Sequence, residues 1–551
     1  MDDGQRTLPR TILQQAEKHG EKPYMIFAHE ETPVSFASLA MNAQAAGAGL
    51  SEDFGLEPGN VAAILLPNGT DFVSAWSACL FAGVVDIPIN YEFKKATLLF
   101  GLKTVEARIL ITDQSGLDRV LDEEVREYLD RLVLVVLTKA TDLADATSRL
   151  RAAGFEKAIA KLDELCQSGR SNSVWETIDG MSLSSIRYTS GTTGAAKGIM
   201  FCHIHLLNRS ATHNRTMTLE GSDRLYSPFP LYHGLAGIMG AIGTLQAGAT
   251  LITTARFSAS RYWTDACTHK ATLGHILFSL MPMVLQQPER ETDRQHSVRY
   301  LYSGWPHRNF EERFGTKLLQ IYAQSELGVM AFRRAGQEEG SRNVGKPLPE
   351  LEVQIVDRFD RPLPPEQIGE IVIRPRVPQS LMLGYYNNLP ATLRAFRNMW
   401  HHTGDSGYLA PNGELYFLGR IGDTIRRRGV NISSDQIDEE ALRHPNVLEC
   451  GTIGVPSPMG EDDIHLCVVW RHPPQDQDKQ VTELAEFLQA RLPKQYVPKF
   501  IEPMETIAKT QTGKIRKADL KSRSGLGRTY DRETRNWLDP RPSGQHPEPR
   551  H

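Results

Sequence analysis

The chain has 551 residues, of which 40% are hydrophobic and 23% are charged. This length exceeds that of one small domain, and this composition excludes a chain that is disordered throughout. The 62 Lys and Arg residues nearly balance the 66 Asp and Glu residues, and a net charge of −4 provides no global cationic field to attract nucleic acid. We therefore expect no nucleic-acid partner.

The cysteines and the N-terminus both favour a cytoplasmic protein. The six cysteines lie far apart, without the spacing of a disulfide scaffold or a metal site. The first residues, 1–10, are acidic and polar and lack the basic and apolar regions of a signal peptide.

Segment 234–255 carries no formal charge and is long enough to cross a bilayer. Its five glycines, its threonines and Gln246 instead favour a buried helix that runs into a strand. We expect no membrane span.

In chain order, strand-like apolar runs alternate with helical patterns, which is typical of βαβ units and parallel sheet. The predicted strands are 61–66, 84–89, 107–112 and 132–137, with a helix at 72–82 and a polar, helix-prone stretch at 141–170. After residue 350, short strands at 352–357 and 369–373 with turn residues between them predict a β-rich subdomain.

Helix and strand patterns return beyond Gly419 and predict a further compact domain. We place an N-terminal domain at 1–419, a hinge at 420–423 and a C-terminal domain at 424–525. The segment 526–551 is rich in Arg, Pro and Gly, and we expect a mobile tail there.

Segment 188–198 has the composition of a polyphosphate-binding loop. Its glycines let the backbone approach an anion, its hydroxyls donate to phosphate oxygens, and Lys197 adds a charge. Ala196 and Gly198 rule out a Walker A loop, which needs Gly before and Ser or Thr after its Lys. A flexible Gly/Thr linker is the alternative. The proposed ligands are Thr189, Ser190, Gly191, Thr192, Thr193, Gly194 and Lys197.

The loop closely resembles the signature of the adenylate-forming superfamily, which includes acyl-CoA synthetases, luciferases and the adenylation domains of peptide synthetases. The superfamily usually has Pro at Ala196, a difference that removes no donor. Further segments resemble family motifs in the same order, at 303–306, 320–328, 403–405, 419–429 and 509–516. Segments 256–263, 286–288, 293–299 and 530–533 resemble the crotonobetaine/carnitine-CoA ligase branch.

The resemblance implies the fold: α/β, with a large N-terminal domain of parallel-rich αβαβα layers plus a β-rich subdomain, and a small mobile α+β C-terminal domain. It also implies nucleotide-binding roles. Tyr322 packs on adenine, Asp405 and Arg420 bind the ribose, and Glu326 holds Mg²⁺. Further nucleotide contacts are assigned to Ser303, Gly304, Trp305, Ala323, Gln324 and Ser325.

The catalytic role of Lys514 is likewise implied by the resemblance. Its ammonium group would offset the charge that develops during adenylation. Taken alone, these motifs have simpler interpretations: Tyr322 and Glu326 as a surface helix pair, 403–405 as a turn, and Lys514 as an exposed lysine. His401 stands where relatives often carry an aromatic residue, and the sequence explains no use for it.

The mobile domain would pivot at Gly422, where relatives usually have Asp or Lys. Gly429 would face the thiol channel, and Arg426, in the cluster 426–428, would attract the phosphates of coenzyme A. A solvated basic turn is an equal alternative for that cluster.

His233, within 228–234, resembles the histidine that borders the carboxylate in acyl and aryl ligases. The Asp-bearing motif of amino-acid adenylation domains is missing there, which favours a simple carboxylic acid. The glycines at 237, 240 and 243 lie on one side of the predicted helix and either leave volume for a bulky acid or permit close helix packing. The acyl-pocket residues are His233, Leu235, Gly237, Gly240 and Ala323.

We therefore expect an ATP-dependent carboxylic acid:CoA ligase that forms acyl-AMP and then acyl-CoA. Its catalytic residues would be Lys197, His233, Glu326 and Lys514, with ATP, Mg²⁺ and coenzyme A as cofactors. The alternatives are transfer of the acyl group to a carrier protein or partner enzyme, and a non-catalytic nucleotide-binding regulator. We expect a monomer or a homodimer.

Overall fold

The computed structural model describes residues 3–188, 197–304, 307–334, 342–427, 430–457, 461–509, 515–523 and 527–539. Within these ranges, no helix combines the length and the apolar character needed to traverse a bilayer. Segment 234–255 forms the π-helix η4 (Leu235–Ile242), the helix α9 (Gly243–Ala247) and the strand β11 (Thr250–Thr253). The prediction of a buried helix that runs into a strand is confirmed.

The first eight-stranded sheet has the order β19-β9-β8-β4-β3-β5-β6-β7. All its pairs are parallel except β8 with β9 and β9 with β19. The strands are β3 (Val61–Leu65), β4 (Val85–Pro88), β5 (Ile109–Thr112), β6 (Leu134–Leu137), β7 (Ala158–Lys161), β8 (Leu183–Tyr188), β9 (Gly198–Cys202) and β19 (Gly384–Tyr385). The four strands predicted before residue 140 are confirmed.

Strand β7 contradicts the prediction, because it lies inside the stretch 141–170 that is predicted to be helix-prone. Its four residues are too short to produce a clear period, and pairing with the buried strand β6 decides their conformation.

The second eight-stranded sheet has the order β15-β14-β13-β12-β10-β11-β1-β2, parallel except at its two edge pairs. The strands are β1 (Pro23–Phe27), β2 (Val34–Ser35), β10 (Arg224–Tyr226), β11, β12 (Leu273–His275), β13 (Tyr300–Ser303), β14 (Lys317–Gln324) and β15 (Gly328–Arg333).

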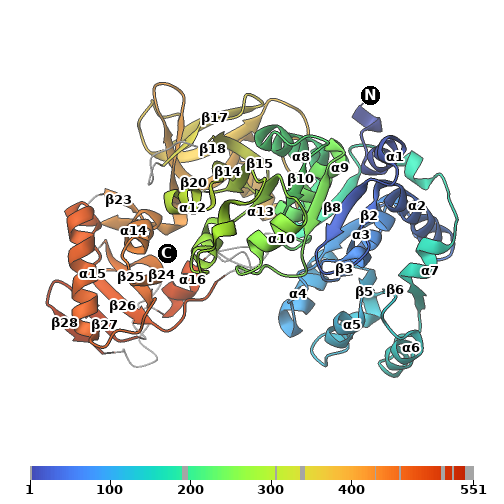
Figure 1. Cartoon of the computed structure of the whole chain (residues 1–551), viewed down its shortest axis with the longest axis horizontal. Helices are drawn as coiled ribbons and strands as arrows, with labels where there is room; N and C mark the ends of the chain where they lie inside the picture. The colour runs from blue at the N-terminus through green and yellow to red at the C-terminus, as the bar shows by residue number, and fades with distance from the viewer. Residues whose placement is uncertain are drawn as a thin grey trace.

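Helices cover both faces of both sheets (Figure 1). One core joins Ala62 and Ile64 of β3, Leu225 of β10 and the inner helices, whereas Val61 and Ala63 face a separate core on the other side of the first sheet. The inner helices are α1 (Leu8–His19), α2 (Phe36–Glu52), α3 (Thr70–Ala82), α7 (Leu162–Gln167), α8 (His203–Met217), η4 and α9. The outer helices are α4 (Lys95–Val105), α5 (Gln114–Val120), η2 (Arg126–Arg131) and α6 (Leu143–Ala152) on the first sheet, and α10 (Tyr262–Thr268), α11 (Met281–Leu285) and α12 (Arg308–Phe314) on the second. The predicted αβαβα layering is confirmed.

The predicted β-rich subdomain is an antiparallel five-stranded sheet with the order β16-β21-β20-β18-β17. Its strands are β16 (Asn343–Gly345), β17 (Leu351–Val356), β18 (Gly369–Pro375), β20 (His401–Leu409) and β21 (Leu415–Arg420), and α13 (Leu389–Ala395) precedes β20. Short turns of helix elsewhere are η1 (Asp3–Gln5), η3 (Val174–Thr177), η5 (Phe278–Leu280), η6 (Glu291–Arg294), η7 (Arg397–Met399), η8 (Ile421–Asp423) and η9 (Lys494–Tyr496).

The C-terminal part lies at one end of the molecule, coloured orange to red in Figure 1. It contains the hairpin of β22 (Thr424–Arg427) and β23 (Val430–Ser433) and a sheet with the order β24-β25-β26-β27-β28. The other elements are β24 (Val447–Pro456), β25 (Asp462–Trp470), β26 (Phe500–Met504), β27 (Thr529–Asp531), β28 (Asn536–Leu538), α14 (Ser434–Leu442), α15 (Gln477–Arg491) and α16 (Lys517–Arg523). Arg342 and Glu439 form an ion pair of 3.1 Å across the two parts.

The prediction of a mobile tail from residue 526 is wrong for residues 529–538. There β27 pairs with β26, β28 pairs with β27, and Tyr530 is buried in the C-terminal core. The many charged residues concealed this hairpin in the sequence, since each strand has only three residues. Residues 540–551 lie outside the described ranges.

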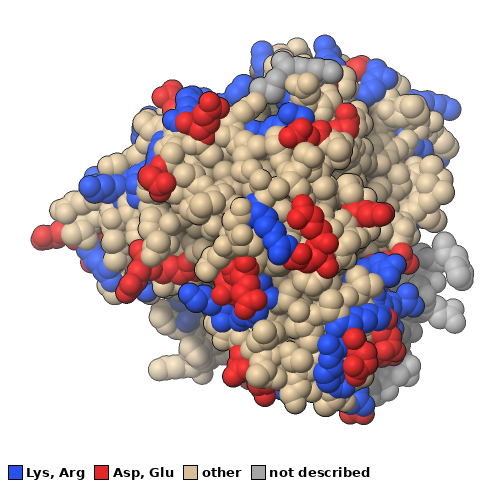
Figure 2. Space-filling view, turned by 90° about the vertical axis from the view of Figure 1, so that its right-hand side faces the viewer, with Lys and Arg blue, Asp and Glu red and all other residues tan. Residues whose placement is uncertain are grey.

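Charges on the surface are mixed. Figure 2 shows one face of the molecule, on which Lys and Arg lie beside Asp and Glu. This arrangement agrees with the near balance of charge in the sequence.

Helix α8 contains histidines that the fold keeps neutral, and His205 gives a testable consequence. Burial lowers the pKa of His205 from 6.5 to about 3, and within the described chain neither ring nitrogen has a hydrogen-bond partner. The unfolded chain therefore binds a proton that the folded chain does not, and stability contributed by the neutral ring is lost as pH falls below 6.5. Leucine cannot titrate at this position.

We expect His205→Leu to gain stability relative to the unmodified protein by about 2 kcal/mol when the pH falls from 7 to 5. Urea unfolding of both proteins at both pH values measures this difference. Carboxyl groups with raised pKa values, such as Asp86 at about 6, cancel in the comparison. An equal loss of stability in the two proteins would contradict the assignment.

Candidate active site

Three of the predicted nucleotide-binding residues contact a fourth, Asp405. One oxygen of Asp405, Oδ2, accepts hydrogen bonds from the Tyr322 hydroxyl and from Nε2 of Gln324, both at 2.6 Å. The other oxygen, Oδ1, lies 3.0 Å from Nε of Arg420. Segments separated by about eighty residues in the chain thus build one polar cluster, in which Asp405 is only 2% exposed.

The strands explain how these side chains are held. Tyr322 and Gln324 belong to β14, Asp405 lies opposite Arg420 in the β20–β21 pair, and Gly404 has a φ of +67°. The alternatives of a surface helix pair and of a turn are therefore wrong, because Tyr322 is buried in strand β14, Glu326 follows that strand, and residues 403–405 belong to strand β20. Burial, reinforced by Asp405, raises the pKa of Tyr322, so its hydroxyl stays protonated and donates.

The structure provides the explanation for His401 that the sequence lacked. Its Nε2 lies 3.1 Å from Oε1 of Gln324. Burial lowers the pKa of His401 to about 4, so the ring is neutral at pH 7. An amide oxygen can only accept, and Nε2 therefore carries the proton. His401 thus orients Gln324, whose Nε2 donates to Asp405 and to the carbonyl of Thr403.

We expect His401→Phe to raise the KM for ATP about fivefold, because one hydrogen bond that orients Gln324 is lost. Steady-state kinetics with varied ATP measure this change. The neighbouring His402 contacts Glu370 at 3.0 Å, and His402→Gln is the matched control, with the KM within about twofold of the unmodified protein. An unchanged KM in His401→Phe would contradict the positioning role.

Glu326 and Lys197 both contact Tyr385, a residue that the sequence did not single out. The Tyr385 hydroxyl donates to Oε1 of Glu326 at 2.9 Å, and Nζ of Lys197 lies 4.9 Å from the Tyr385 ring centroid. Tyr385 reaches this position because β19 pairs with β9, which begins directly after Lys197. The available signal was Gly384-Tyr385-Tyr386, which follows a turn and ends an apolar run.

The π-helix η4 begins at Leu235, two residues after His233, and Nδ1 of His233 accepts a hydrogen bond from the backbone N–H of Leu235 at 3.3 Å. A Cβ at Gly237 would stand 1.9 Å from the carbonyl oxygen of Leu231, and one at Gly243 would stand 2.7 Å from Oδ1 of Asn214. The hypothesis that these glycines leave volume for a bulky acid is therefore wrong at both positions. Close helix packing explains them, and Gly240 likewise faces Leu251.

The remaining predicted residues divide into two groups. Ser303 is buried at the end of β13, Gly304 and Ala323 are half-buried, and Ser325 is exposed. Several predicted residues lie outside the described ranges, namely Thr189, Ser190, Gly191, Thr192, Thr193, Gly194, Trp305, Gly429 and Lys514.

Around the predicted hinge, Gly422 is exposed in η8, and a Cβ there would meet no atom within 4 Å. Arg426 belongs to β22. In the same basic cluster, Arg427 is buried, lies 3.6 Å from Asp463 and donates to the carbonyl of Val497 at 2.9 Å. Arg427 therefore holds segments of the C-terminal part together.

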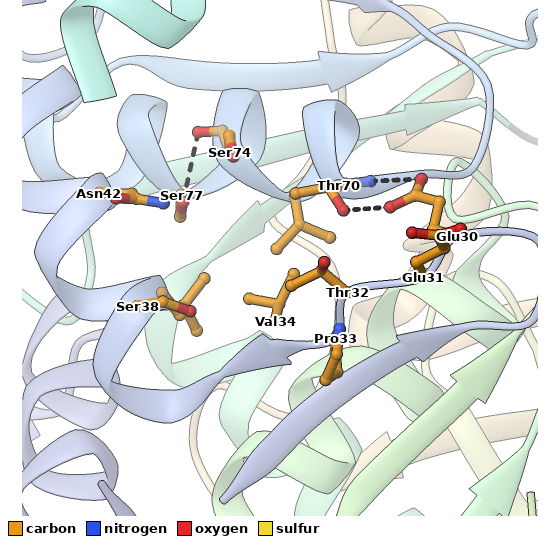
Figure 3. Close-up of a pocket in the computed structure, with 12 residues that line it drawn as sticks. Glu30, Glu31, Thr32, Pro33, Val34, Ser38, Asn42, Thr70, Ser74 and Ser77 are labelled. Atoms are coloured by element: carbon orange, nitrogen blue, oxygen red, sulfur yellow. Dashed lines mark hydrogen bonds between the residues drawn. The ribbon is translucent and has the colours of Figure 1, made fainter. Parts of the chain in front are cut away.

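A surface pocket of about 550 Å³ lies between α2 and α3 and the segment 30–34 (Figure 3). Its polar groups bind one another: Glu30 accepts from the backbone N–H of Thr70 at 3.1 Å and from the Thr70 hydroxyl, and Ser77 donates to the Ser74 carbonyl. No predicted site residue lines it.

Comparison with known proteins identifies the class. Residues 12–386 match the model of the AMP-binding enzyme family, and residues 436–514 match that of the AMP-binding enzyme C-terminal domain. The chain therefore belongs to the AMP-binding enzyme family. Within it, the protein is an adenylate-forming enzyme of the acyl-CoA synthetase kind.

Among its relatives, sulfoacetate–CoA ligase of Cupriavidus necator is 30% identical over 84% of this chain and 88% of its own length. Oxalate–CoA ligase of Arabidopsis thaliana is 27% identical over 85% and 89%, and crotonobetaine/carnitine–CoA ligase of Salmonella paratyphi A is 27% identical over 92% and 97%. The predicted likeness to the crotonobetaine/carnitine branch is confirmed.

Solved structures share the fold at low sequence identity. Anthranilate CoA ligase AuaEII in complex with anthranoyl-AMP has a TM-score of 0.82 and 20% identity, covering 95% of this chain and 98% of that one. O-succinylbenzoate coenzyme A synthetase of Bacillus subtilis, in complex with ATP and magnesium ion, has a TM-score of 0.75 and 24% identity, covering 93% and 99%.

Proposed function

We propose that this protein joins a small carboxylic acid to coenzyme A in two half-reactions driven by ATP. In the first, a carboxylate oxygen attacks the α-phosphorus, the bond from that phosphorus to the bridging oxygen breaks, and pyrophosphate leaves. In the second, the CoA thiol attacks the acyl carbon, loses its proton, and AMP leaves. The observation that carries this proposal is the cluster of Tyr322, Gln324, Asp405 and Arg420.

The cluster suits the nucleoside end of ATP. Oδ1 of Asp405 and the half-exposed guanidinium of Arg420 offer an acceptor and donors to ribose hydroxyls. Tyr322 supplies an aromatic ring whose hydroxyl is already held by Asp405. We assign the ribose to Asp405 and Arg420 and the adenine to Tyr322 and the turn at Ser303 and Gly304.

Glu326 fits a magnesium ligand. Tyr385 holds Oε1, while Oε2 accepts no hydrogen bond from the described residues. A carboxylate oxygen is the hard donor that Mg²⁺ prefers. Bound there, the ion would neutralise charge on the departing pyrophosphate. Lys197, whose ammonium group lies over the Tyr385 ring, would bind a phosphate oxygen together with the loop 189–194.

The substrate is assigned to the region beside His233. The acids named for the relatives are sulfoacetate, oxalate and crotonobetaine or carnitine, all of them short and all carrying a second charged group. The close packing at Gly237 and Gly243 also favours a short acid over a polycyclic one.

A panel of carboxylic acids with ATP, Mg²⁺ and CoA tests the proposal. We expect pyrophosphate release that depends on the acid, and an acyl-CoA product identified by its mass. Release without any CoA thioester would favour a carrier protein as acceptor. If no acid promotes pyrophosphate release or the exchange of labelled pyrophosphate into ATP, the proposal is wrong and the nucleotide-binding regulator is favoured.

A further inference from the structure

Arg209, in helix α8, is a buried cation with no carboxylate at ion-pair distance among the described residues. It is 6% exposed, and the described residues provide no ion pair to its guanidinium. One nitrogen, Nη1, donates to the carbonyl of Ser325, and the Phe201 ring centroid lies 5.6 Å from the guanidinium carbon. Nε is buried and makes no hydrogen bond within the described chain.

A comparison with Arg187 shows that this arrangement is unusual within the same core. Arg187 is equally buried, but its guanidinium lies 3.0 Å from Oδ1 of the buried Asp86. Desolvation makes an uncompensated buried charge costly, and proteins therefore pair such charges or neutralise them. Burial lowers the pKa of Arg209 to about 10, and the negative charge of Glu326, beyond ion-pair distance, offsets part of this effect, so the side chain stays charged at pH 7. An anion supplied from outside the chain would complete the pair.

The position of Arg209 indicates which anion its guanidinium would bind. A Cβ at Gly234 would stand 3.5 Å from Nη2 of Arg209, and Gly234 directly follows His233. At Gly328, whose φ is +97°, a Cβ would stand 2.9 Å from Cγ of Arg209. The guanidinium therefore lies between the turn that holds His233 and the turn at 325–328, which contains Glu326.

We propose that Arg209 binds a second oxyanion group of the substrate, so that this enzyme selects short carboxylic acids that carry another carboxylate or a sulfonate. This inference rests on the proposed function, because it places the reacting carboxylate beside His233. A buried, already desolvated guanidinium favours a charged group strongly over a neutral group of the same shape.

The test compares acids that differ only in the charge at the far end. Succinate, its monoamide succinamate and butyrate would be assayed for acid-dependent pyrophosphate release, with malonate and glutarate to vary the length and 3-sulfopropanoate to distinguish sulfonate from carboxylate. We expect the preferred diacid or sulfonate to exceed its neutral counterpart by at least about 30-fold in kcat/KM.

Variants assign that preference to Arg209. In Arg209→Gln, the kcat/KM values for the charged acid and its neutral counterpart should differ by no more than about threefold. Arg209→Lys keeps the positive charge and should retain part of the preference for the charged acid. Arg215→Gln is the matched control: Arg215 lies on the same helix, 57% of its side chain is exposed, and it pairs with Glu350. This variant should keep the full preference. Melting temperatures show which variants fold. If Arg209→Gln does not fold, the comparison of charged and neutral acids is made with Arg209→Lys.

Two results would overturn the inference while leaving the proposed function intact. One is a preference of the unmodified protein for neutral monocarboxylic acids. The other is an equal loss of activity toward charged and neutral acids in Arg209→Gln, which would mean that Arg209 only supports the turn at Ser325. If no acid of any kind promotes pyrophosphate release, the proposed function itself fails, and the inference fails with it.

Discussion

Lys514→Ala is expected to slow formation of acyl-AMP by about 10²- to 10³-fold, while thioester formation from supplied acyl-AMP stays within about threefold of the unmodified protein. An ammonium group near the attacking carboxylate and the α-phosphate offsets charge that builds up during adenylation, and this charge does not build up in the same way during thiol attack. Pyrophosphate release and acyl-CoA formation, measured separately, distinguish the two steps. Lys514 lies outside the described residues, and its role is proposed from the motif at 509–516.

Lys509, in the same motif, provides the matched control. It pairs with Glu449 at the surface of the C-terminal part, and Lys509→Ala should leave both half-reactions within about threefold of the unmodified protein. Lys517 is unsuitable, because its buried ammonium pairs with Asp435 at 2.6 Å and Asp438 at 2.8 Å and serves the fold. Equal loss of both half-reactions in Lys514→Ala would argue against separate conformations for the two steps.

Asp405→Ala is expected to raise the dissociation constant for ATP by about 10²- to 10³-fold, because two charge-assisted hydrogen bonds to the ribose would be lost. The same change leaves Tyr322 and Gln324 without their acceptor and Arg420 without its ion pair. We therefore also expect a loss of about 3 kcal/mol in stability. Nucleotide titration by calorimetry and urea unfolding measure the two effects.

Asp118→Asn is the control for Asp405→Ala, since Asp118 pairs with Arg149 on the surface at 2.7 Å. It should change neither quantity measurably. A folded Asp405→Ala protein that binds ATP within twofold of the unmodified protein would contradict the ribose assignment.

The glycines of η4 illustrate why local pattern leaves some questions open. Their spacing by three was compatible both with free volume and with close packing, because the sequence does not say what lies opposite each Cα. The carbonyl of Leu231 and the side chain of Asn214 occupy those positions. Only the positions of these other segments of the same chain could decide between free volume and close packing.

The sequence by itself determined the class of the protein, the alternation that builds the αβαβα layers and the side chains to which we assign the nucleotide. These depend on periodicity and on motif order, which are local properties of the chain. The tertiary structure decided that His401 orients Gln324, that Tyr385 links Lys197 to Glu326 and that Arg209 is buried with no ion-pair partner in the described part of the chain. Each of these depends on packing between distant segments, and the free energy of a buried polar group depends on which partners that packing supplies.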